Sequence, residues 1–259
     1  RAQAEAVDLF LKERTAILAA MADTHTFHEM INEKNLSSIF TVMNLRAGAF
    51  VDLGVISNAG QQLAYVGPYQ LQGLNYYMEE WFGEAMSRGI YISDVYLGYR
   101  QLPHFIIAVR RQEGQNTWIL RATIDPTVFG ALVRAAQVGK TGDAFIVNDR
   151  GMYQTPPRFG GQILNPSGLD TRLFGGSTTL VALKDAEGRG FLYAGSWLKE
   201  GKWLFLIRQE AGEEMGGLFA ARNVEIVIIL CGVLAIILTI VYTSRMTVRR
   251  LREADERTN

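Results

Sequence analysis

The chain has 259 residues, and its 26 lysines and arginines balance 26 aspartates and glutamates, so the formal net charge is zero. Because charges of both signs are intermixed, nothing in the composition indicates a nucleic-acid-binding surface. The only cysteine is Cys231, and no third ligand accompanies His25 and His28. We therefore expect no disulfide in the folded portion, no metal and no cofactor.

The first 47 residues contain neither glycine nor proline, and their apolar residues recur at helical spacing. The pattern predicts one amphipathic helix over residues 1–47, about 65 Å long if unbroken, with a relaxed point near Thr24–Thr26. Such a helix should run alongside two domains or form a dimer seam.

Strand-like patterns begin at residue 49. Residues 49–57 and 61–66 flank a hairpin signal at Asn58-Ala59-Gly60. A helix over 76–88, strands over 91–97, 104–111 and 118–124, and a helix from Asp125-Pro126 to about residue 137 follow. We define residues 48–137 as the first module.

The same order of elements returns in shorter form over residues 138–209, the second module. Strands are expected at 144–148, 152–155, 178–184, 190–198 and 203–209. The fold class is therefore α+β, with two mixed sheets of similar plan beside one long N-terminal helix. A connecting helix is expected over residues 210–223.

Residues 224–243 form an apolar stretch whose last 18 residues carry no charge. They span roughly 27 Å as a helix, enough to cross most of a bilayer, and predict a transmembrane helix. Four arginines follow and place the C-terminus in the cytoplasm: Arg245, Arg249, Arg250 and Arg252. Residues 1–222 are then extracytoplasmic, in the periplasm outside an inner membrane. We expect another membrane helix before Arg1 and a signalling module after Asn259.

Several short motifs occur in order: Trp81-Phe82, Tyr91-Ile92-Ser93-Asp94, Arg121-Ala122-Thr123-Ile124-Asp125, and the run from Gly139 to Asn148. With the long helix before them, they resemble the double Cache (dCache) sensor domain of bacterial transmembrane receptors. The resemblance implies two PAS-like modules, a small ligand in the first and membrane-distal module, and a homodimer. It also implies a sensor histidine kinase or a chemotaxis receptor.

The start of the cytoplasmic linker, residues 244–259, helps to choose between these outputs. The charged run from Thr247 contains no proline, whereas chemotaxis receptors usually continue into a module that carries one soon after the membrane. This favours a histidine kinase whose catalytic part lies beyond the chain and whose partner is a cytoplasmic response regulator. A chemotaxis receptor is the alternative.

The first module is rich in aromatic and polar residues of the kind that line small-ligand pockets. Arg121 and Thr123 are two apart on one strand and share a face, as His104 and Ile106 do on another. Arg121 and His104 would offer a positive donor set for a carboxylate. The candidate ligand-binding residues are Trp81, Phe82, Tyr91, Asp94, Tyr96, Arg100, His104, Arg121 and Thr123.

The alternative is that Arg121 pairs with an acidic neighbour such as Asp94 or Glu80, and that the aromatic residues are core. The family's amino-acid-binding version carries an arginine two residues before its tryptophan and an aspartate on the last strand. Glu79 and Thr123 hold those positions here, which favours a small anionic or carboxylic metabolite over an ordinary amino acid. Trp81→Ala is expected to abolish ligand stabilisation while leaving the fold largely intact.

Two rival functions need consideration. An ectodomain that binds a protein partner and no metabolite would be favoured by a pocket filled with its own side chains. A hydrolase is not supported, since no nucleophile–base pair or metal set can be assembled from these residues. In the second module, Tyr153, Arg158, Arg172 and Trp197 are expected to be core and surface residues first.

Overall fold

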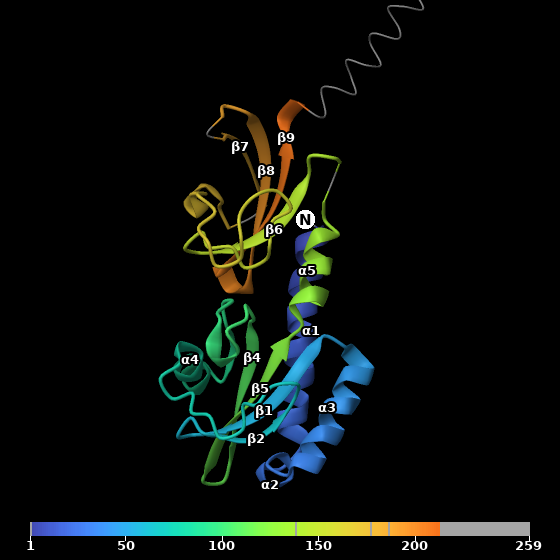
Figure 1. The fold of residues 1–259 in the computed structure, drawn as a ribbon, viewed down its shortest axis with the longest axis vertical. Helices are drawn as coiled ribbons and strands as arrows, with labels where there is room; N and C mark the ends of the chain where they lie inside the picture. Colours follow the sequence, from blue (N-terminus) through green and yellow to red (C-terminus); the bar gives the residue numbers. More distant parts are fainter. Residues whose placement is uncertain (1, 138, 177, 186, 213–259) are drawn as a thin grey trace, which may run out of the picture. The chain divides into compact units, whose positions relative to one another are not determined.

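The computed structural model describes residues 2–137, 139–176, 178–185 and 187–212 (Figure 1). Residues 1–210 form one compact unit. The expected connecting helix beyond Gly212, the transmembrane helix and the cytoplasmic linker all lie outside the described residues. Within the described ranges, none of the helices combines the length and apolar composition needed to cross a membrane.

The N-terminal segment is helical but not one helix. It forms α1 (Ala2–Thr24), α2 (Phe27–Met30) and α3 (Glu33–Ala47). Thr26 and Asn32 cap the helices that follow them, Thr26 in a capping box with Glu29, and each cap requires extended backbone that ends the preceding helix. The prediction of a single helix over 1–47 is therefore wrong, although its relaxed point is where α1 ends. Figure 1 shows α3 returning alongside α1.

The first module contains a five-stranded sheet in the order β2-β1-β5-β4-β3, and every pairing is antiparallel. Its strands are β1 (Phe50–Ser57), β2 (Gln62–Val66), β3 (Ile90–Ile92), β4 (Ile106–Glu113) and β5 (Asn116–Ile124). Helices α1 and α3 pack on one face, and α4 (Glu80–Arg88) lies on the other (Figure 1). Because strand side chains alternate, Trp118, Leu120 and Ala122 of β5 join the core under α1, which directs Arg121 and Thr123 to the α4 side.

The second module contains a four-stranded antiparallel sheet in the order β6-β9-β8-β7. Its strands are β6 (Asp143–Asn148), β7 (Thr179–Lys184), β8 (Gly190–Leu198) and β9 (Trp203–Glu210). This order repeats β1-β5-β4-β3, as the abbreviated second half of the sequence predicts. The prediction of mixed sheets is wrong, because all described pairings are antiparallel. Residues 152–155 form only isolated bridges in place of the expected strand.

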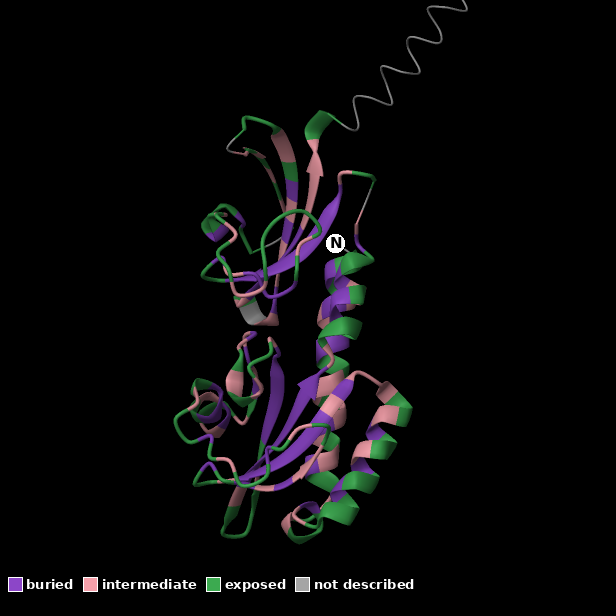
Figure 2. Ribbon diagram, viewed as in Figure 1, coloured by how far each residue is buried: buried purple, intermediate pink, exposed green. Residues whose placement is uncertain are grey.

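The two sheets share one hydrophobic core along α1 and α5 (Pro126–Arg134). Trp203, the first residue of β9, packs against Phe105 and Phe129 with ring centroids 5.2 and 5.8 Å apart. Phe129 in turn contacts Phe10 of α1 at 5.8 Å. Figure 2 shows strands β1, β5 and β6 largely buried. Burying one such ring stabilises the fold by about 1.5–3 kcal/mol, so this aromatic group joins the modules firmly.

Candidate ligand-binding site

A cluster of charged residues is buried on the α4 side of the first sheet. In the β1–β5 register Asp52 lies opposite Thr123, and Gly54 lies opposite Arg121. The side chains of Asp52 and Arg121 are no more than 1% exposed. A carboxylate and a guanidinium on adjacent strands of one sheet face can meet directly, and Arg121 Nη2 lies 3.5 Å from Asp52 Oδ1.

Arg100 enters the same cluster from a short 3-10 turn, η1 (Gly98–Arg100). Its Nη2 lies 2.5 Å from Asp52 Oδ2 and also donates to Thr123 Oγ1. The guanidinium carbon sits 4.7 Å from the Tyr69 ring centroid, a cation–π distance. The Tyr65 hydroxyl donates to Asp52 at 3.1 Å, so the carboxylate of Asp52 is fully engaged by this chain.

The arginines, in contrast, retain hydrogen-bonding capacity. Arg121 Nη1 donates to the Tyr76 hydroxyl over 3.5 Å, a long contact. Neither Arg100 Nε nor Arg121 Nε has an acceptor among the residues that the structure describes. Two buried guanidinium groups thus face one buried carboxylate, and buried cations of this kind are costly unless an anion pairs with them.

Gly54 makes room for this arrangement. A Cβ at this position would lie 3.0 Å from Gln62 Oε1 and 3.5 Å from Arg121 Nη2. Any larger residue would therefore press on Gln62 and on the guanidinium of Arg121. Gln62 is anchored by its Nε2, which donates to the Leu71 carbonyl at 2.8 Å.

A small cavity lies above Arg121 and Arg100. Its volume is about 10 Å³, which holds a single water molecule. The lining residues come from the loop before α4, the segment around η1, and β5: Leu71, Tyr76, Glu79, Tyr96, Gly98, Tyr99, Arg100, His104 and Arg121. A larger ligand would enter only if part of this wall, such as the η1 turn, moved outward.

His104 does not contribute a positive charge to the cavity. Burial, together with the neighbouring charges of Arg100 and Arg121, lowers the pKa of its imidazole to about 4. Its Nδ1 lies 2.8 Å from the Leu102 carbonyl, an acceptor only, so the proton resides on Nδ1 and Nε2 is an acceptor. The sequence-based expectation of a cationic His104 beside Arg121 is therefore wrong; Arg100 provides the second cation.

The predicted aromatic residues divide into two groups. Tyr96 lines the cavity, with its ring 4.5 Å from that of His104. Trp81, Phe82 and Tyr91 instead form a packed layer between α4 and the sheet, and each is no more than 9% exposed. Trp81 stands behind Tyr76 at a centroid distance of 5.3 Å, so it supports the cavity wall without lining it.

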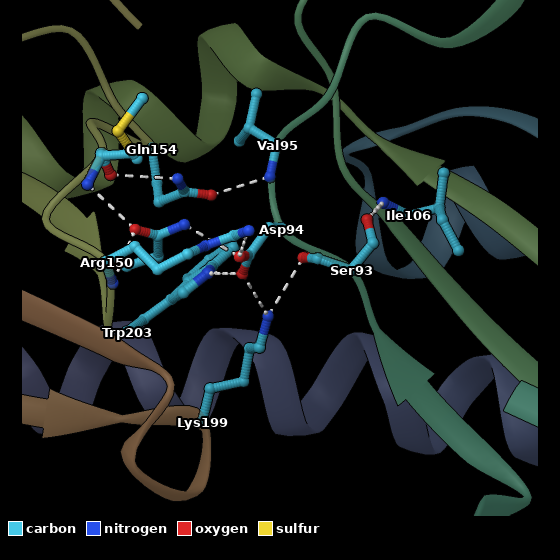
Figure 3. Close-up of polar contacts among 10 residues, drawn as sticks. Ser93, Asp94, Val95, Ile106, Arg150, Gln154, Lys199 and Trp203 are labelled. Atoms are coloured by element: carbon cyan, nitrogen blue, oxygen red, sulfur yellow. Dashed lines mark hydrogen bonds and ion pairs between the residues drawn. The ribbon is translucent and has the colours of Figure 1, made fainter. Parts of the chain in front are cut away.

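Asp94 lies away from the cavity, where the first module meets the second (Figure 3). Its Oδ1 accepts from Trp203 Nε1 at 2.8 Å, and its Oδ2 accepts from Asn148 Nδ2 at 3.0 Å. The amine of Lys199 lies 3.4 Å away, and Arg150 lies 3.5 Å away. The structure thus separates Asp94 from Arg121, whose carboxylate partner is Asp52 and not Asp94 or Glu80.

Asp94 and Lys199 are both charged at neutral pH. Burial alone raises the pKa of the Asp94 carboxyl, but the charge of Lys199 and the hydrogen bonds from Asn148 and Trp203 outweigh burial and lower the pKa overall. Burial lowers the pKa of Lys199 to about 8 in spite of the favourable charge of Asp94. The pair is therefore an ionised contact at the junction of the modules.

The four residues considered in the second module occupy separate positions. Tyr153 packs against Phe145 in the core, and Trp197 Nε1 donates to the Phe174 carbonyl at 2.8 Å. Arg172 is exposed and pairs with Asp170. The backbone of Arg158 donates to the buried Asp143.

Sequence reasoning did not identify Asp52, Tyr65 or Tyr69. Asp52 carried a usable signal, because it is a single charged residue inside the otherwise apolar strand β1. Its partner Arg100 lies 48 residues away, and no local pattern connects the two. Tyr65 and Tyr69 carry no comparable signal.

No family model matches the sequence, and no curated protein matches it. Among solved structures the chain is similar to the extracellular domain of rpHK1S-Z16, a protein assigned as a histidine kinase. The identity is 12%, the TM-score is 0.66, and the alignment covers 83% of this chain and 93% of the other.

Two further solved structures are similar. One is the ligand-binding domain of the amino acid chemoreceptor PctB of Pseudomonas aeruginosa in complex with L-Gln, at 15% identity, TM-score 0.62, and coverage of 85% and 95%. The other is an extracellular ligand-binding receptor from Desulfohalobium retbaense, at 11% identity and TM-score 0.65, with 80% of this chain aligned to 38% of that one. The resemblance to double Cache sensor domains is thus confirmed at the level of the fold.

Proposed function

We propose that this chain is the extracytoplasmic ligand-sensing portion of a transmembrane receptor, and that its first module binds a small molecule bearing a carboxylate. The fold supports the sensing role, since it is shared with extracellular domains of histidine kinases and chemoreceptors. One of these domains was solved with an amino acid bound.

The charge of the buried cluster is the observation that supports a ligand bearing a carboxylate. Arg100 and Arg121 share the single carboxylate of Asp52, and each keeps an Nε–H without an acceptor among the described residues. A carboxylate seated above Arg121 would accept from these groups and neutralise the surplus charge. Guanidinium groups recognise carboxylates well because their donors match both oxygens.

Glu79 is an anion of this chain that competes for the same position. It lines the cavity, and although it precedes α4 it makes no capping hydrogen bond. Without a ligand its carboxylate can offset part of the arginine charge from the rim. Glu79→Gln should therefore strengthen binding of an anionic ligand, whereas Glu80→Gln, one residue further from the cavity lining, should not.

We infer the output of the receptor from the sequence beyond the described residues. The apolar stretch 224–243 and the arginines after it support a single crossing of the inner membrane with a cytoplasmic C-terminus. The proline-free linker supports a dimeric histidine kinase that signals to a response regulator. A chemotaxis receptor is the alternative, since domains of both kinds share the fold.

A thermal-shift screen of the 259-residue chain tests the ligand class. We would compare matched compounds of one carbon skeleton, namely propionate, propylamine, 1-propanol and alanine, and extend the panel to larger acids, sugars and purines. Stabilisation by acids but not by the matched amine or alcohol is the expected result. Stabilisation only by uncharged or cationic compounds would contradict the proposal.

A second candidate function is favoured by the size of the cavity. At about 10 Å³ it leaves room for only a single water molecule among the side chains of the chain itself, as expected of an ectodomain that binds a protein partner and no metabolite. A well-folded chain that responds to no compound in the screen would favour this reading.

A further inference from the structure

The segment Ser93–Tyr96 forms part of the cavity wall and also contacts the second module. Tyr96 forms part of the cavity wall, and its backbone pairs with His104 in both directions, at 2.9 and 3.0 Å. Two residues earlier, Asp94 is bound to the second module. Because the segment is short, a movement of Tyr96 cannot leave Asp94 unaffected.

Asp94 makes several of the contacts between this segment and the second module. Its carboxylate accepts from the indole of Trp203 and the amide of Asn148, and it pairs with the amine of Lys199 (Figure 3). The same amine donates to the Ser93 carbonyl at 3.1 Å. These partners stand on β6, on β9 and on the turn η3 (Lys199–Gly201) that leads into β9.

The backbone of the segment is held as well. Val95 N donates to Gln154 Oε1 at 2.7 Å, a buried contact, and Gln154 Nε2 donates to the Met152 carbonyl. On the other side, the Ser93 hydroxyl accepts from Ile106 N at the start of β4. The segment is thus attached to the second module through Asp94 and Val95, and to the first sheet through Ser93 and Tyr96.

Trp203 links this junction to strand β9. It is fully buried against Phe105, the neighbour of His104 in sequence, and it is the first residue of β9. Strand β9 lies between β6 and β8 and ends at Glu210, where the compact unit ends. Whatever shifts Trp203 therefore acts on the strand from which the chain continues toward its C-terminus.

We propose that Asp94 is a positioning residue that couples the cavity wall at Tyr96 to strand β9 through Trp203. That this coupling reports a bound ligand rests on the proposed function. The coupling itself does not depend on a ligand, so the two are tested separately. A displacement of Tyr96 moves Asp94, and Asp94 transmits it to Trp203 and Lys199, because coupling between sites is carried by packed side chains and by networks of hydrogen bonds and ion pairs.

The test is a double-mutant cycle read by amide hydrogen exchange of the 259-residue chain. Tyr96→Ala removes the ring that stacks on His104 and serves as the perturbation. We expect it to accelerate exchange of the β9 amides Leu204–Arg208 at least threefold, with a smaller effect on β7 at the far edge of the same sheet. In the Asp94→Asn background the effect of Tyr96→Ala on β9 should fall by at least half.

Asp8→Asn is the matched control, because Asp8 pairs with Lys12 on α1 and takes no part in the junction. In that background the full effect of Tyr96→Ala on β9 should remain. Should Asp94→Asn fail to fold, Trp203→Phe removes the indole donor to Asp94, keeps an aromatic ring beside Phe105 and Phe129, and should uncouple β9 in the same way. An effect of Tyr96→Ala that is confined to the first module, or that is undiminished in both uncoupling backgrounds, would overturn the proposal.

A propionate titration of Asp94→Asn then separates this proposal from the proposed function. We expect propionate still to bind to Asp94→Asn, but without the changes in β9 amide exchange that its binding causes in the unmodified chain. Absence of binding in the unmodified chain would count against the proposed ligand class, while the exchange cycle would still decide the coupling.

Discussion

Arg100 and Asp52 are 48 residues apart in the sequence, yet their side chains form a 2.5 Å ion pair in which neither is more than 3% exposed. Asp52 stands on strand β1 of the first sheet, whereas Arg100 stands on a short turn above it. The pair therefore closes the turn over the cavity and leaves Arg121 as the guanidinium with the less complete set of partners. An outward movement of this turn would open the cavity to a larger ligand.

Asp52→Asn should destabilise the fold strongly. The change leaves two buried guanidinium groups without a carboxylate, and removal of one partner from a buried ion pair costs about 3–5 kcal/mol. Urea denaturation followed by circular dichroism would measure the free energy of unfolding. Asp170→Asn, which disrupts an exposed pair with Arg172, is the control and should change stability little. A loss below about 1 kcal/mol for Asp52→Asn would show that the cluster is not buried as described.

Trp81→Ala should reduce stability by about 3–5 kcal/mol, because the side chain is 3% exposed and packs on Tyr76 and Phe82. The sequence-based expectation that this substitution leaves the fold largely intact is not supported by the packing. Tyr99→Phe is the better probe of the cavity, since Tyr99 is half exposed and donates through its hydroxyl to the Asn75 carbonyl. Differential scanning calorimetry of both variants would compare them; equal melting temperatures would contradict the assigned positions.

The positions of the strands along the chain were largely predictable from the sequence, whereas the turns between helices were not. Runs of apolar residues located β1, β4, β5, β8 and β9 within a few residues, because β1, β5 and the first halves of β4 and β9 are buried almost continuously. The break between α1 and α3 was only partly visible, since apolar residues continue at helical spacing through Phe27 and Ile31 while the caps at Thr26 and Asn32 reverse the chain.

The parts of the candidate site that lie on one strand were predictable from the sequence. The contacts between residues that are distant in the sequence were not. Arg121 and Thr123 were placed on one face by alternation alone. The ion pair between Asp52 and Arg100 depends on where the η1 turn lies over the sheet. The spacing of apolar residues in the sequence does not predict that position. Asp94 was misplaced for the same reason, since its partners Asn148 and Trp203 belong to the second module.

Stability should fall between about pH 6.5 and pH 4 because of His104. Burial lowers the pKa of the folded imidazole to about 4, and Arg100, Arg121 and Asp52 are the charged groups that face it. In this window the unfolded chain binds a proton that the folded chain does not, so the free energy of unfolding decreases as the pH falls, by up to about 3 kcal/mol. His104→Gln should remove that part of the slope in urea denaturation series. A variant with the same pH dependence as the unmodified chain would show that folding does not lower the pKa of His104.

Gly54→Ala should weaken ligand binding more than it weakens the fold. The added Cβ would meet Gln62 Oε1 at 3.0 Å and lie against the guanidinium of Arg121, and overpacking of this kind costs about 1–3 kcal/mol. Gly83→Ala on α4 is the control, because nothing lies within 4 Å of a Cβ there. Equal effects of the two substitutions on the affinity for a stabilising acid would separate Gly54 from the site.

The most direct measurement is calorimetric titration of the acid that stabilises the chain best into three proteins: the unmodified chain, Arg121→Gln, and Arg111→Gln. Arg121→Gln leaves Asp52 paired with Arg100 and Tyr65, and Arg111 is a half-exposed arginine of the same sheet that pairs with Asp23. Loss of a charged hydrogen bond worth about 3 kcal/mol should raise the Kd roughly a hundredfold for Arg121→Gln and leave it unchanged for Arg111→Gln. The same Kd in the unmodified chain and in Arg121→Gln would contradict the assignment of the buried arginine cluster as the ligand-binding site.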